Sequence, residues 1–303
     1  MSIAVICPFG IDEGLVSKTV SLTNASVRVL IPASQVQEAI QLGATHIHTL
    51  PDGLSIHDEE SFAVQLAEKI RIWGDSIVCA PATVQTRNIM SMTAWQLKAG
   101  LTADCTDLFI KDGILLQTRP AFGNNLMATI QTLSPIQMAT VRPNHFRSCL
   151  RPVQNSEILP ECFTDCSDRV CVEEFIPYPD EKPLGQAEII IAGGLGIGSA
   201  EGFSKLSALA KKMGAAIAAS RSAVDAGFAP YHCQVGLTGV TVSPRLYIAV
   251  GISGAVQHLS GMSGAETVVA INSDPRALIF DYADYGIVGD WETVIQKVSE
   301  ELL

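Results

Sequence analysis

The sequence predicts an α/β protein built from two Rossmann-like domains with parallel sheets. Three observations lead to this fold class: a length of 303 residues, a hydrophobic fraction of 48% and a regular alternation of apolar strand-like runs with helical patterns. A chain of this length exceeds what one hydrophobic core usually supports. Near-continuous Val, Ile and Ala runs are typical of strands buried on both faces of a parallel sheet, and their alternation with helices predicts a sheet covered by helices.

Residues 1–150 form the predicted N-terminal domain. Helices are expected at residues 34–42 and 59–72, where apolar residues recur at helical spacing. After residues 86–100 the pattern changes to short strands with little helix, and Asp112-Gly113 predicts a hairpin turn between the first two of them. The expected strands of this domain are residues 3–6, 27–31, 46–50, 76–80, 106–111, 114–118, 126–131 and 138–141.

Residues 151–185 are polar and rich in proline, which predicts a linker. The predicted second domain covers residues 186–303 and opens with an apolar strand at 186–192, a glycine run and a helix at 199–213. Further strands at 215–219, 246–250 and 267–271 and a final helix from about Trp291 complete a second, smaller α/β unit.

Charge and hydropathy argue against several classes of partner. The formal net charge of −11 disfavours a nucleic-acid backbone, because that partner requires clustered Lys and Arg. No apolar run approaches the roughly 18 residues of a membrane span. The start of the chain lacks the basic lead-in of a signal peptide and fits a first buried strand. We therefore expect no nucleic-acid binding, no membrane insertion and a cytoplasmic location.

The eight cysteines are expected to be reduced, as is usual in the cytosol. Cys149, Cys162, Cys166 and Cys171 cluster near and within the predicted linker. Their intervals lack the two-residue spacing of ferredoxin-type clusters and do not suit a zinc site. We therefore expect no metal there, and an iron–sulfur site is the less favoured interpretation.

A glycine run, Gly193-Gly194-Leu195-Gly196-Ile197-Gly198, stands between a predicted strand and a predicted helix. Free amides at the positive end of a helix bind phosphate, which suits a nucleotide. The NAD signature is incomplete, because its third glycine would fall on Ser199 and the usual acid about 20 residues on is replaced by Ser220 and Arg221. Close packing of helix against strand explains the same glycines equally well.

Longer motifs in the second half occur in the order found in a known family: ASRSAVDAG (219–227), QVGLTG (234–239), LYIAVGISGAVQHL (246–259) and ADYGIVGD (283–290). Together they resemble the FAD domain of electron transfer flavoprotein alpha subunits. GLTADCT (100–106), TRPAFGN (118–124) and ATVRP (139–143) are similar to the N-terminal domain of that family. The resemblance implies FAD as the cofactor and an electron transfer flavoprotein beta subunit as the partner.

The resemblance also implies a set of cofactor-binding residues. Arg221 would lie beside the isoalloxazine ring and favour the anionic reduced flavin, since a guanidinium keeps its proton. Thr238 would hydrogen-bond flavin N5, and His258 would approach the O2 edge, donating a hydrogen bond or becoming cationic. Without the motifs, these three would be explained as a surface ion-pair partner, a turn residue and a packing histidine. The full set is Ser220, Arg221, Val235, Gly236, Leu237, Thr238, Ser253, Gly254, Ala255, Val256, Gln257, His258, Asn272, Asp290 and Trp291.

Two positions depart from the family pattern. Leu195 stands where the family commonly has Arg, and Leu237 stands where it commonly has Gln. The departures remove one positive charge and one polar contact from the FAD neighbours that the resemblance implies, and they leave the FAD affinity and potential open.

The implied function is electron transfer without a substrate of the chain's own. The electron donor would be a dehydrogenase such as an acyl-CoA dehydrogenase, and a ferredoxin or a quinone oxidoreductase is a further implied partner. Two alternatives stay open on the sequence: an NAD(P)-dependent dehydrogenase that uses Arg221 for a 2′-phosphate, and a non-redox nucleotide-binding regulator.

Overall fold

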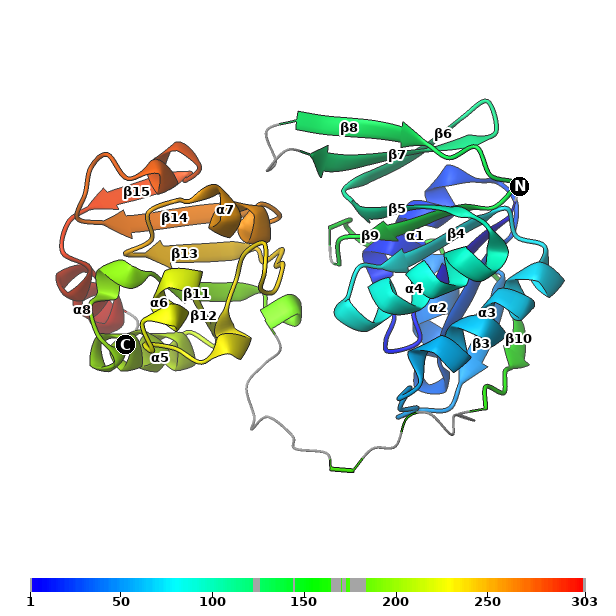
Figure 1. Ribbon diagram of the computed structural model, residues 1–303, viewed down its shortest axis with the longest axis horizontal. Helices are drawn as coiled ribbons and strands as arrows, with labels where there is room; N and C mark the ends of the chain where they lie inside the picture. Colours follow the sequence, from blue (N-terminus) through cyan, green and yellow to red (C-terminus); the bar gives the residue numbers. More distant parts are fainter. Residues whose placement is uncertain are drawn as a thin grey trace. The chain divides into compact units, whose positions relative to one another are not determined.

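The computed structural model describes residues 2–121, 126–143, 145–164, 170, 173–174 and 184–301. The chain divides into two compact units, Met1–Ile176 and Pro177–Leu303. Each unit is built around its own parallel sheet with helices on both faces (Figure 1). The predicted α/β class with two Rossmann-like units is therefore confirmed.

A seven-stranded sheet forms the centre of the N-terminal unit, with the strand order β10-β3-β2-β1-β4-β9-β5 and every pair parallel. The apolar runs read from the sequence are buried in it, as in β1, where all four residues are buried. Its strands are β1 (Ile3–Ile6), β2 (Val27–Pro32), β3 (His46–Leu50), β4 (Ile77–Pro81), β5 (Gly100–Cys105), β9 (Gln137–Val141) and β10 (Glu157–Pro160).

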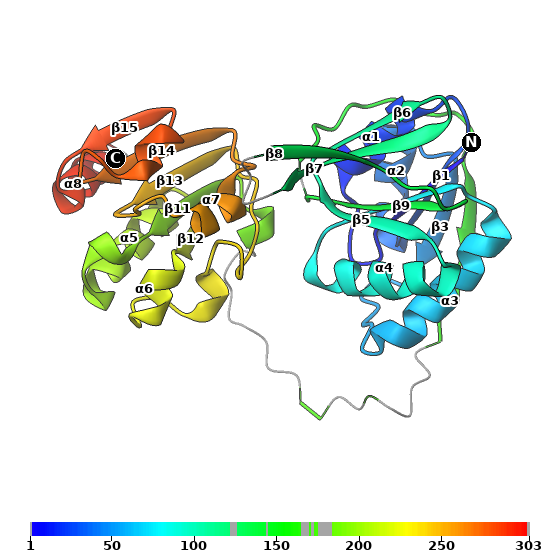
Figure 2. The ribbon, with the colours of Figure 1, turned by 45° about the horizontal axis from the view of Figure 1, so that its top comes forward.

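Helices cover the two faces of this sheet. The helices α1 (Glu13–Leu22) and α2 (Val36–Leu42) pack on one face, and α3 (Glu59–Trp73) and α4 (Val84–Leu97) pack together on the other (Figure 2). Helix α3 presents buried residues at helical spacing and begins at Asp58, whose side chain accepts a hydrogen bond from the Ser61 amide. None of the helices in the described part of the chain is both long and apolar enough to span a membrane.

The N-terminal unit also contains a separate antiparallel sheet. It is formed by β6 (Asp107–Lys111), β7 (Ile114–Ala121) and β8 (Leu126–Gln131). The turn between β6 and β7 is formed by Asp112 and Gly113, whose φ angles of 52° and 78° are both positive. Positive φ at both central residues is the requirement of the tight hairpin turn. The hairpin predicted at Asp112-Gly113 is therefore confirmed.

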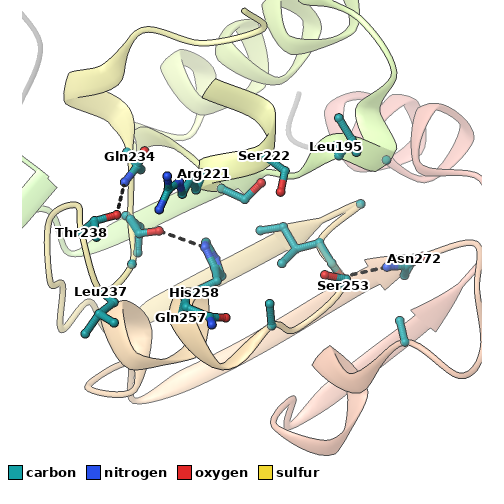
Figure 3. Close-up of a pocket in the computed structure, with 18 of the residues that line it drawn as sticks. Leu195, Arg221, Ser222, Gln234, Leu237, Thr238, Ser253, Gln257, His258 and Asn272 are labelled. Atoms are coloured by element: carbon teal, nitrogen blue, oxygen red, sulfur yellow. Dashed lines mark hydrogen bonds between the residues drawn. The ribbon is translucent and has the colours of Figure 1, made fainter. Parts of the chain in front are cut away.

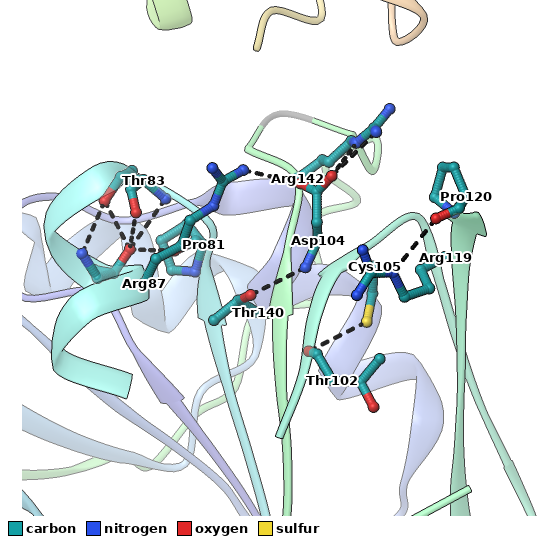
Figure 4. A network of polar contacts seen from close by, with 11 residues as sticks. Pro81, Thr83, Arg87, Thr102, Asp104, Cys105, Arg119, Pro120, Thr140 and Arg142 are labelled. Carbon is teal, nitrogen blue, oxygen red and sulfur yellow. Dashed lines mark hydrogen bonds and ion pairs between the residues drawn. The ribbon is translucent and has the colours of Figure 1, made fainter. Parts of the chain in front are cut away.

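An ion-pair cluster lies where β4, β5 and β9 end (Figure 4). Asp104 accepts hydrogen bonds from Arg87 at 3.0 Å and from Nε and Nη2 of Arg142 at 3.1 Å. The Arg142 side chain is only 6% exposed. Asp104 itself has a φ of 62°, at the point where the register of β5 against β9 shifts. One carboxylate thus holds two guanidinium groups at a bulged strand end.

Part of the predicted linker belongs to the N-terminal sheet. Strand β10 pairs with the edge of β3, and Glu161, directly after it, contacts Nδ1 of His48 at 2.6 Å and also the ammonium group of Lys69. Phe163 then stacks on Phe62 with 4.4 Å between ring centroids. The structure assigns residues 157–164 to the N-terminal unit, whereas most of the remaining predicted linker, residues 165–169, 171–172 and 175–183, lies outside the described residues.

The C-terminal unit contains a five-stranded parallel sheet with the order β12-β11-β13-β14-β15. Helices α5 (Ala200–Lys212), α6 (Arg221–Asp225) and α8 (Trp291–Glu301) contribute to the core on one face, and α7 (Val256–Met262) packs on the other. The strands are β11 (Ile189–Gly193), β12 (Ala216–Ala219), β13 (Leu246–Val250), β14 (Thr267–Asn272) and β15 (Tyr285–Val288).

Candidate functional site

The candidate site lies at the carboxyl ends of β11 and β13. These strands are neighbours, but the chain leaves β11 for β12 on one side and leaves β13 for β14 on the other. Connections that diverge in this way open a crevice between them, which is where doubly wound sheets bind ligands. A cavity of about 560 Å³ occupies this position (Figure 3).

Glycines form the floor of the crevice, where two loops touch through their backbones. The amide of Gly194 donates to the Val250 carbonyl at 2.8 Å, and that of Gly196 donates to the Gly251 carbonyl at 3.0 Å. A Cβ on Gly194 would lie 2.1 Å from the Gly251 oxygen, and Gly251 has a φ of 63°. Loop-to-loop packing therefore explains Gly194. The packing of helix against strand that the sequence left open is found at Gly193, where a Cβ would lie 2.6 Å from the Phe203 side chain of α5.

The loop after β13 has an equally strict requirement for glycine. Gly254 has a φ of 89°, and a Cβ there would lie 2.2 Å from the Ile279 nitrogen. The Ile279 amide donates to the Ser253 carbonyl at 3.1 Å, which holds the two segments together. Ser253 and Ala255 face the cavity as a result.

Hydrogen bonds around Thr238 shape the opposite wall. Its hydroxyl accepts from the Gln234 side chain at 3.0 Å (Figure 3). Its carbonyl accepts from the Tyr231 hydroxyl at 3.0 Å. Having accepted from Gln234, the Thr238 hydroxyl keeps its own hydrogen as a donor. This donor lines the cavity.

Arg221 supplies an exposed positive charge at the same cavity. It follows Ser220, whose side chain accepts from the Ala223 amide at 3.3 Å and caps α6. The Arg221 guanidinium pairs with Asp225 at 3.4 Å, with a side-chain exposure of 67%. A pair so exposed contributes about 1 kcal/mol at most. The guanidinium can therefore be redirected to an anionic ligand at low cost.

The side chain of His258 is buried, and both of its ring nitrogens form hydrogen bonds within the protein. Nδ1 is 3.0 Å from the Val235 carbonyl oxygen, and Nε2 is 2.9 Å from the hydroxyl of Tyr247. Burial lowers the pKa of His258 to about 4, so the ring is neutral at pH 7. The carbonyl can only accept, which assigns the single ring hydrogen to Nδ1. The expected role of His258 as a cation or hydrogen-bond donor to a ligand is corrected, because its one N–H is already used.

We expect the stability of the chain to fall as the pH drops below the ordinary pKa of histidine. Between about pH 6.5 and about pH 4 the unfolded state binds a proton at His258 that the folded state excludes, which costs about 3 kcal/mol in total. Above this window the ring is neutral in both states and the cost vanishes. Urea unfolding from about pH 7.5 to about pH 4.5 measures the effect. His258→Asn should flatten the profile, and an equally steep profile in that variant contradicts the assignment.

Most of the residues predicted from the sequence line this one cavity. They are Ser220, Arg221, Val235, Gly236, Leu237, Thr238, Ser253, Ala255, Gln257, His258 and Asn272. Gly254, in the loop after β13, and Val256, the first residue of α7, do not line the cavity.

Asp290 and Trp291 lie instead in a second cavity, of about 740 Å³, between α5 and α8. The Asp290 carboxylate accepts from the amide of Thr293 at 3.0 Å and from its hydroxyl at 2.8 Å. Those hydrogen bonds lower the pKa of Asp290. Here Asp290 acts as a helix cap rather than as part of the first cavity.

The first cavity also has lining residues absent from the predicted set. Ser222 and Gln234 stand inside motifs that were already recognised and could have been included. Asp274 and Ala277 follow β14 without a motif of their own. The further lining residues are Leu195, Gly196, Ser222, Gln234, Gly251, Ile252, Asp274 and Ala277.

Within the part of the chain that the structure describes, no group of three or more His, Cys, Asp or Glu side chains could hold a metal ion. Cys149 and Cys162 are free and exposed. Cys166 and Cys171 lie outside the described residues, so the absence of a metal at the cysteine cluster stays a prediction.

A doubly wound parallel sheet with glycine loops under a cavity at its switch point defines a nucleotide-binding α/β protein. Residues 183–263 match the electron transfer flavoprotein FAD-binding domain, and residues 10–158 match the electron transfer flavoprotein domain. The chain belongs to the electron transfer flavoprotein family, within which its relatives are alpha subunits and the FixB proteins. The resemblance read from the sequence is confirmed.

Three relatives illustrate the similarity. The electron transfer flavoprotein subunit alpha of Thermoanaerobacterium thermosaccharolyticum is 41% identical over 88% of this chain and 83% of its own length. The subunit of the same name from Bacillus subtilis is 36% identical, over 94% of this chain and 89% of its own. Protein FixB of Clostridium saccharobutylicum is 44% identical, over 73% of this chain and 68% of its own.

The residues of the site fit FAD, the cofactor of this domain family. Glycines let the two loops pack backbone against backbone, which shapes the floor of the cavity. Hydroxyl and guanidinium donors from Thr238 and Arg221 face the same cavity. Leu195 and Leu237 are 54% and 71% exposed there, so the two departures from the family pattern place apolar side chains at the mouth of the site.

Proposed function

We propose that this chain is the FAD-binding alpha subunit of a heterodimeric electron transfer flavoprotein and passes electrons from a dehydrogenase to another redox partner. The observation that carries the proposal is the meeting of three separate motifs, from residues 219–227, 234–239 and 246–259, at one cavity. Bound FAD supplies the electron chemistry, while the protein binds it and sets its electrostatic surroundings. The chain has no substrate of its own in this proposal.

Different residues of the cavity would hold different parts of the cofactor. Arg221 would balance negative charge on the ring system, because a guanidinium keeps its proton at any ordinary pH. Thr238 would donate its remaining hydrogen to a ring nitrogen. The loop of residues 253–258 would follow the ribityl and pyrophosphate part, and Gly254 allows that loop to pack against the backbone of Ile279. His258 would support the wall rather than donate to the ligand, since both of its nitrogens are engaged.

The partners of the chain follow from the same family membership. We propose a beta subunit as the permanent partner, docked on the N-terminal unit. An acyl-CoA dehydrogenase is the proposed electron donor, and a ferredoxin or a quinone oxidoreductase is the alternative redox partner. A cytoplasmic location stays a prediction from the sequence.

Co-expression with the beta subunit tests the proposal. We expect a one-to-one complex on sizing with light scattering, and visible absorption bands of protein-bound FAD. A stable but colourless complex would refute the flavin carrier. In that event, oxidation of NAD(P)H would favour a dehydrogenase, and binding of AMP or ATP without redox chemistry would favour a nucleotide-dependent regulator.

Restoring the family's positive charge should tighten FAD binding. We expect Leu195→Arg to lower the FAD dissociation constant about tenfold, since a hydrogen bond to a charged group contributes about 1.5–3 kcal/mol. Leu133→Arg is the matched control, because Leu133 is 90% exposed in the other unit and receives the same charge. Fluorescence titration of the complex with FAD measures both. Equal tightening by the two variants would show that net charge alone is responsible.

A further inference from the structure

Tyr247 is a fully buried phenol in the middle of β13, 0% exposed and outside the cavity lining. A phenol in such a position needs a hydrogen-bond partner. Its oxygen is 2.9 Å from Nε2 of His258, and its burial raises the pKa far above the ordinary value, so it keeps its hydrogen. Tyr247 is therefore an O–H group aimed at a histidine that does line the cavity.

The direction of the two hydrogen bonds of His258 follows from the chemistry of its partners. The Val235 carbonyl can only accept, so Nδ1 carries the ring hydrogen and donates it across 3.0 Å. Nε2 of a neutral ring is then an acceptor, and the Tyr247 hydroxyl is the donor. A one-way chain of hydrogen bonds thus runs from the sheet core through the imidazole to the backbone of Val235.

Val235 begins the wall segment, residues 235–238, which carries Leu237 and Thr238 into the cavity. Backbone hydrogen bonds also hold the segment: the Val235 amide donates to the Ala219 carbonyl at 3.0 Å, the Gly236 amide to the Val240 carbonyl at 3.3 Å, and the Leu237 amide to the Gln257 carbonyl at 2.7 Å. Thr238 accepts in addition from Gln234 and Tyr231. The carbonyl of Val235 is therefore one of several support points of the segment, and the one that His258 supplies.

We propose that Tyr247 is a positioning residue of the flavin site: its hydroxyl donates to Nε2 and holds the neutral His258 ring in place, and His258 in turn holds the wall segment at the place where it contacts FAD. The proposal rests on the function proposed above. It deepens that function by assigning a role to a residue that never touches the cofactor. Binding of FAD to a preformed wall avoids the cost of ordering it.

Two substitutions break the chain of hydrogen bonds at different links. Phe at position 247 leaves Nε2 without its donor, so the imidazole ring is no longer held on that side and can turn away from Val235. Asn at position 258 keeps an N–H near the place of Nδ1 and loses the link to Tyr247. If Tyr247 acts through His258, the two substitutions cannot have independent effects.

The experiment uses the complete alpha–beta complex as wild type, Tyr247→Phe, His258→Asn and the double variant. Nitrogen-15 NMR of labelled histidine, recorded on the FAD-free complex, should show the Nδ1–H tautomer for His258 in wild type and a shifted Nε2 resonance in Tyr247→Phe, because that nitrogen no longer accepts a hydrogen bond. The FAD dissociation constant should rise about five- to tenfold in Tyr247→Phe, the scale of one lost buried hydrogen bond. In the His258→Asn background the same substitution should change it less than about twofold. Tyr282→Phe, at an exposed tyrosine, is the matched control and should also stay within about twofold.

Three results would overturn the proposal: an Nε2–H tautomer in wild type, an FAD dissociation constant unchanged in Tyr247→Phe, or effects of the two substitutions that add independently. A merely structural tyrosine would lower the unfolding midpoint of the variant without changing its FAD dissociation constant. Wild-type complex that binds no FAD would refute the proposed function, and the NMR tautomer would then decide the hydrogen-bond chain by itself.

Discussion

The Gly254→Ala variant is expected to lose FAD almost completely, with a dissociation constant raised about 100-fold. An alanine at a φ of 89° adopts a conformation that costs about 1–2 kcal/mol, and overpacking costs about 1–3 kcal/mol more. The overlap cannot be relieved by a side-chain rotation, because the nearest atom is the backbone nitrogen of Ile279, 2.2 Å from the new Cβ. About 3 kcal/mol corresponds to the stated loss of affinity.

The Gly214→Ala variant is the control that separates the effect of the steric overlap from the effect of the positive φ angle. Gly214 has a φ of 63°, and a Cβ added there would have no heavy atom within 4 Å, so this position shares the strain without the overlap. FAD content after gel filtration, together with circular dichroism, distinguishes loss of the site from loss of the fold. If the two variants retained FAD equally well, the fit of the loop against Ile279 would not be what holds the site open.

Replacement of Asp104 by Ala should lower the free energy of unfolding of the N-terminal unit by about 3 kcal/mol or more. The substitution removes the carboxylate from Arg142, whose side chain is only 6% exposed, and a buried charge that loses its partner is strongly destabilising. It also places Ala at a φ of 62°, where Asp is better tolerated. Urea unfolding followed by circular dichroism measures the loss.

Asp104→Asn and Glu292→Ala serve as comparisons for this prediction. Asn tolerates the positive φ, so that variant isolates the effect of the charge. Glu292 pairs with Lys205 at a site where both side chains are 51% exposed, and its loss should cost less than about 1 kcal/mol. A loss below about 1 kcal/mol for Asp104→Ala would show that Arg142 is adequately solvated or otherwise held without it.

Elements with a strong periodic pattern were predictable from the sequence. The bounds expected for β1, β3, β8 and β13 agree with the structure, because short apolar runs between turn residues leave little room for another assignment. Helix α1 was missed: its Ser, Thr and Val content gives weak helix propensity, and packing of Leu15 and Val16 on the sheet stabilises it instead. Residues 138–141 were expected as a strand, but their place between β4 and β5 depends on long-range pairing.

The residues of the candidate site that lie within recognised motifs were predictable from the sequence. Thr238 and Arg221 line the cavity as the resemblance implied. The hydrogen bonds of His258 could not be predicted, because its partners lie 23 and 11 positions away along the chain and meet only in the fold. A histidine beside an anionic ligand and one that supports a loop have the same sequence, and burial decides between them.

Strand β10 also determines when the N-terminal sheet closes during synthesis. Glu161, directly after β10, contacts His48 across 113 positions, so the outer edge of β3 stays unpaired while most of the unit is translated. Unpaired strand edges are templates for aggregation, and late long-range pairing prolongs that exposure. Because β10 precedes β11 in the chain, the N-terminal sheet can be completed before synthesis of the C-terminal unit has begun. A nascent chain that ends before β10 is thus expected to be prone to aggregation. A chain that ends shortly after β10 is expected to contain a folded N-terminal sheet.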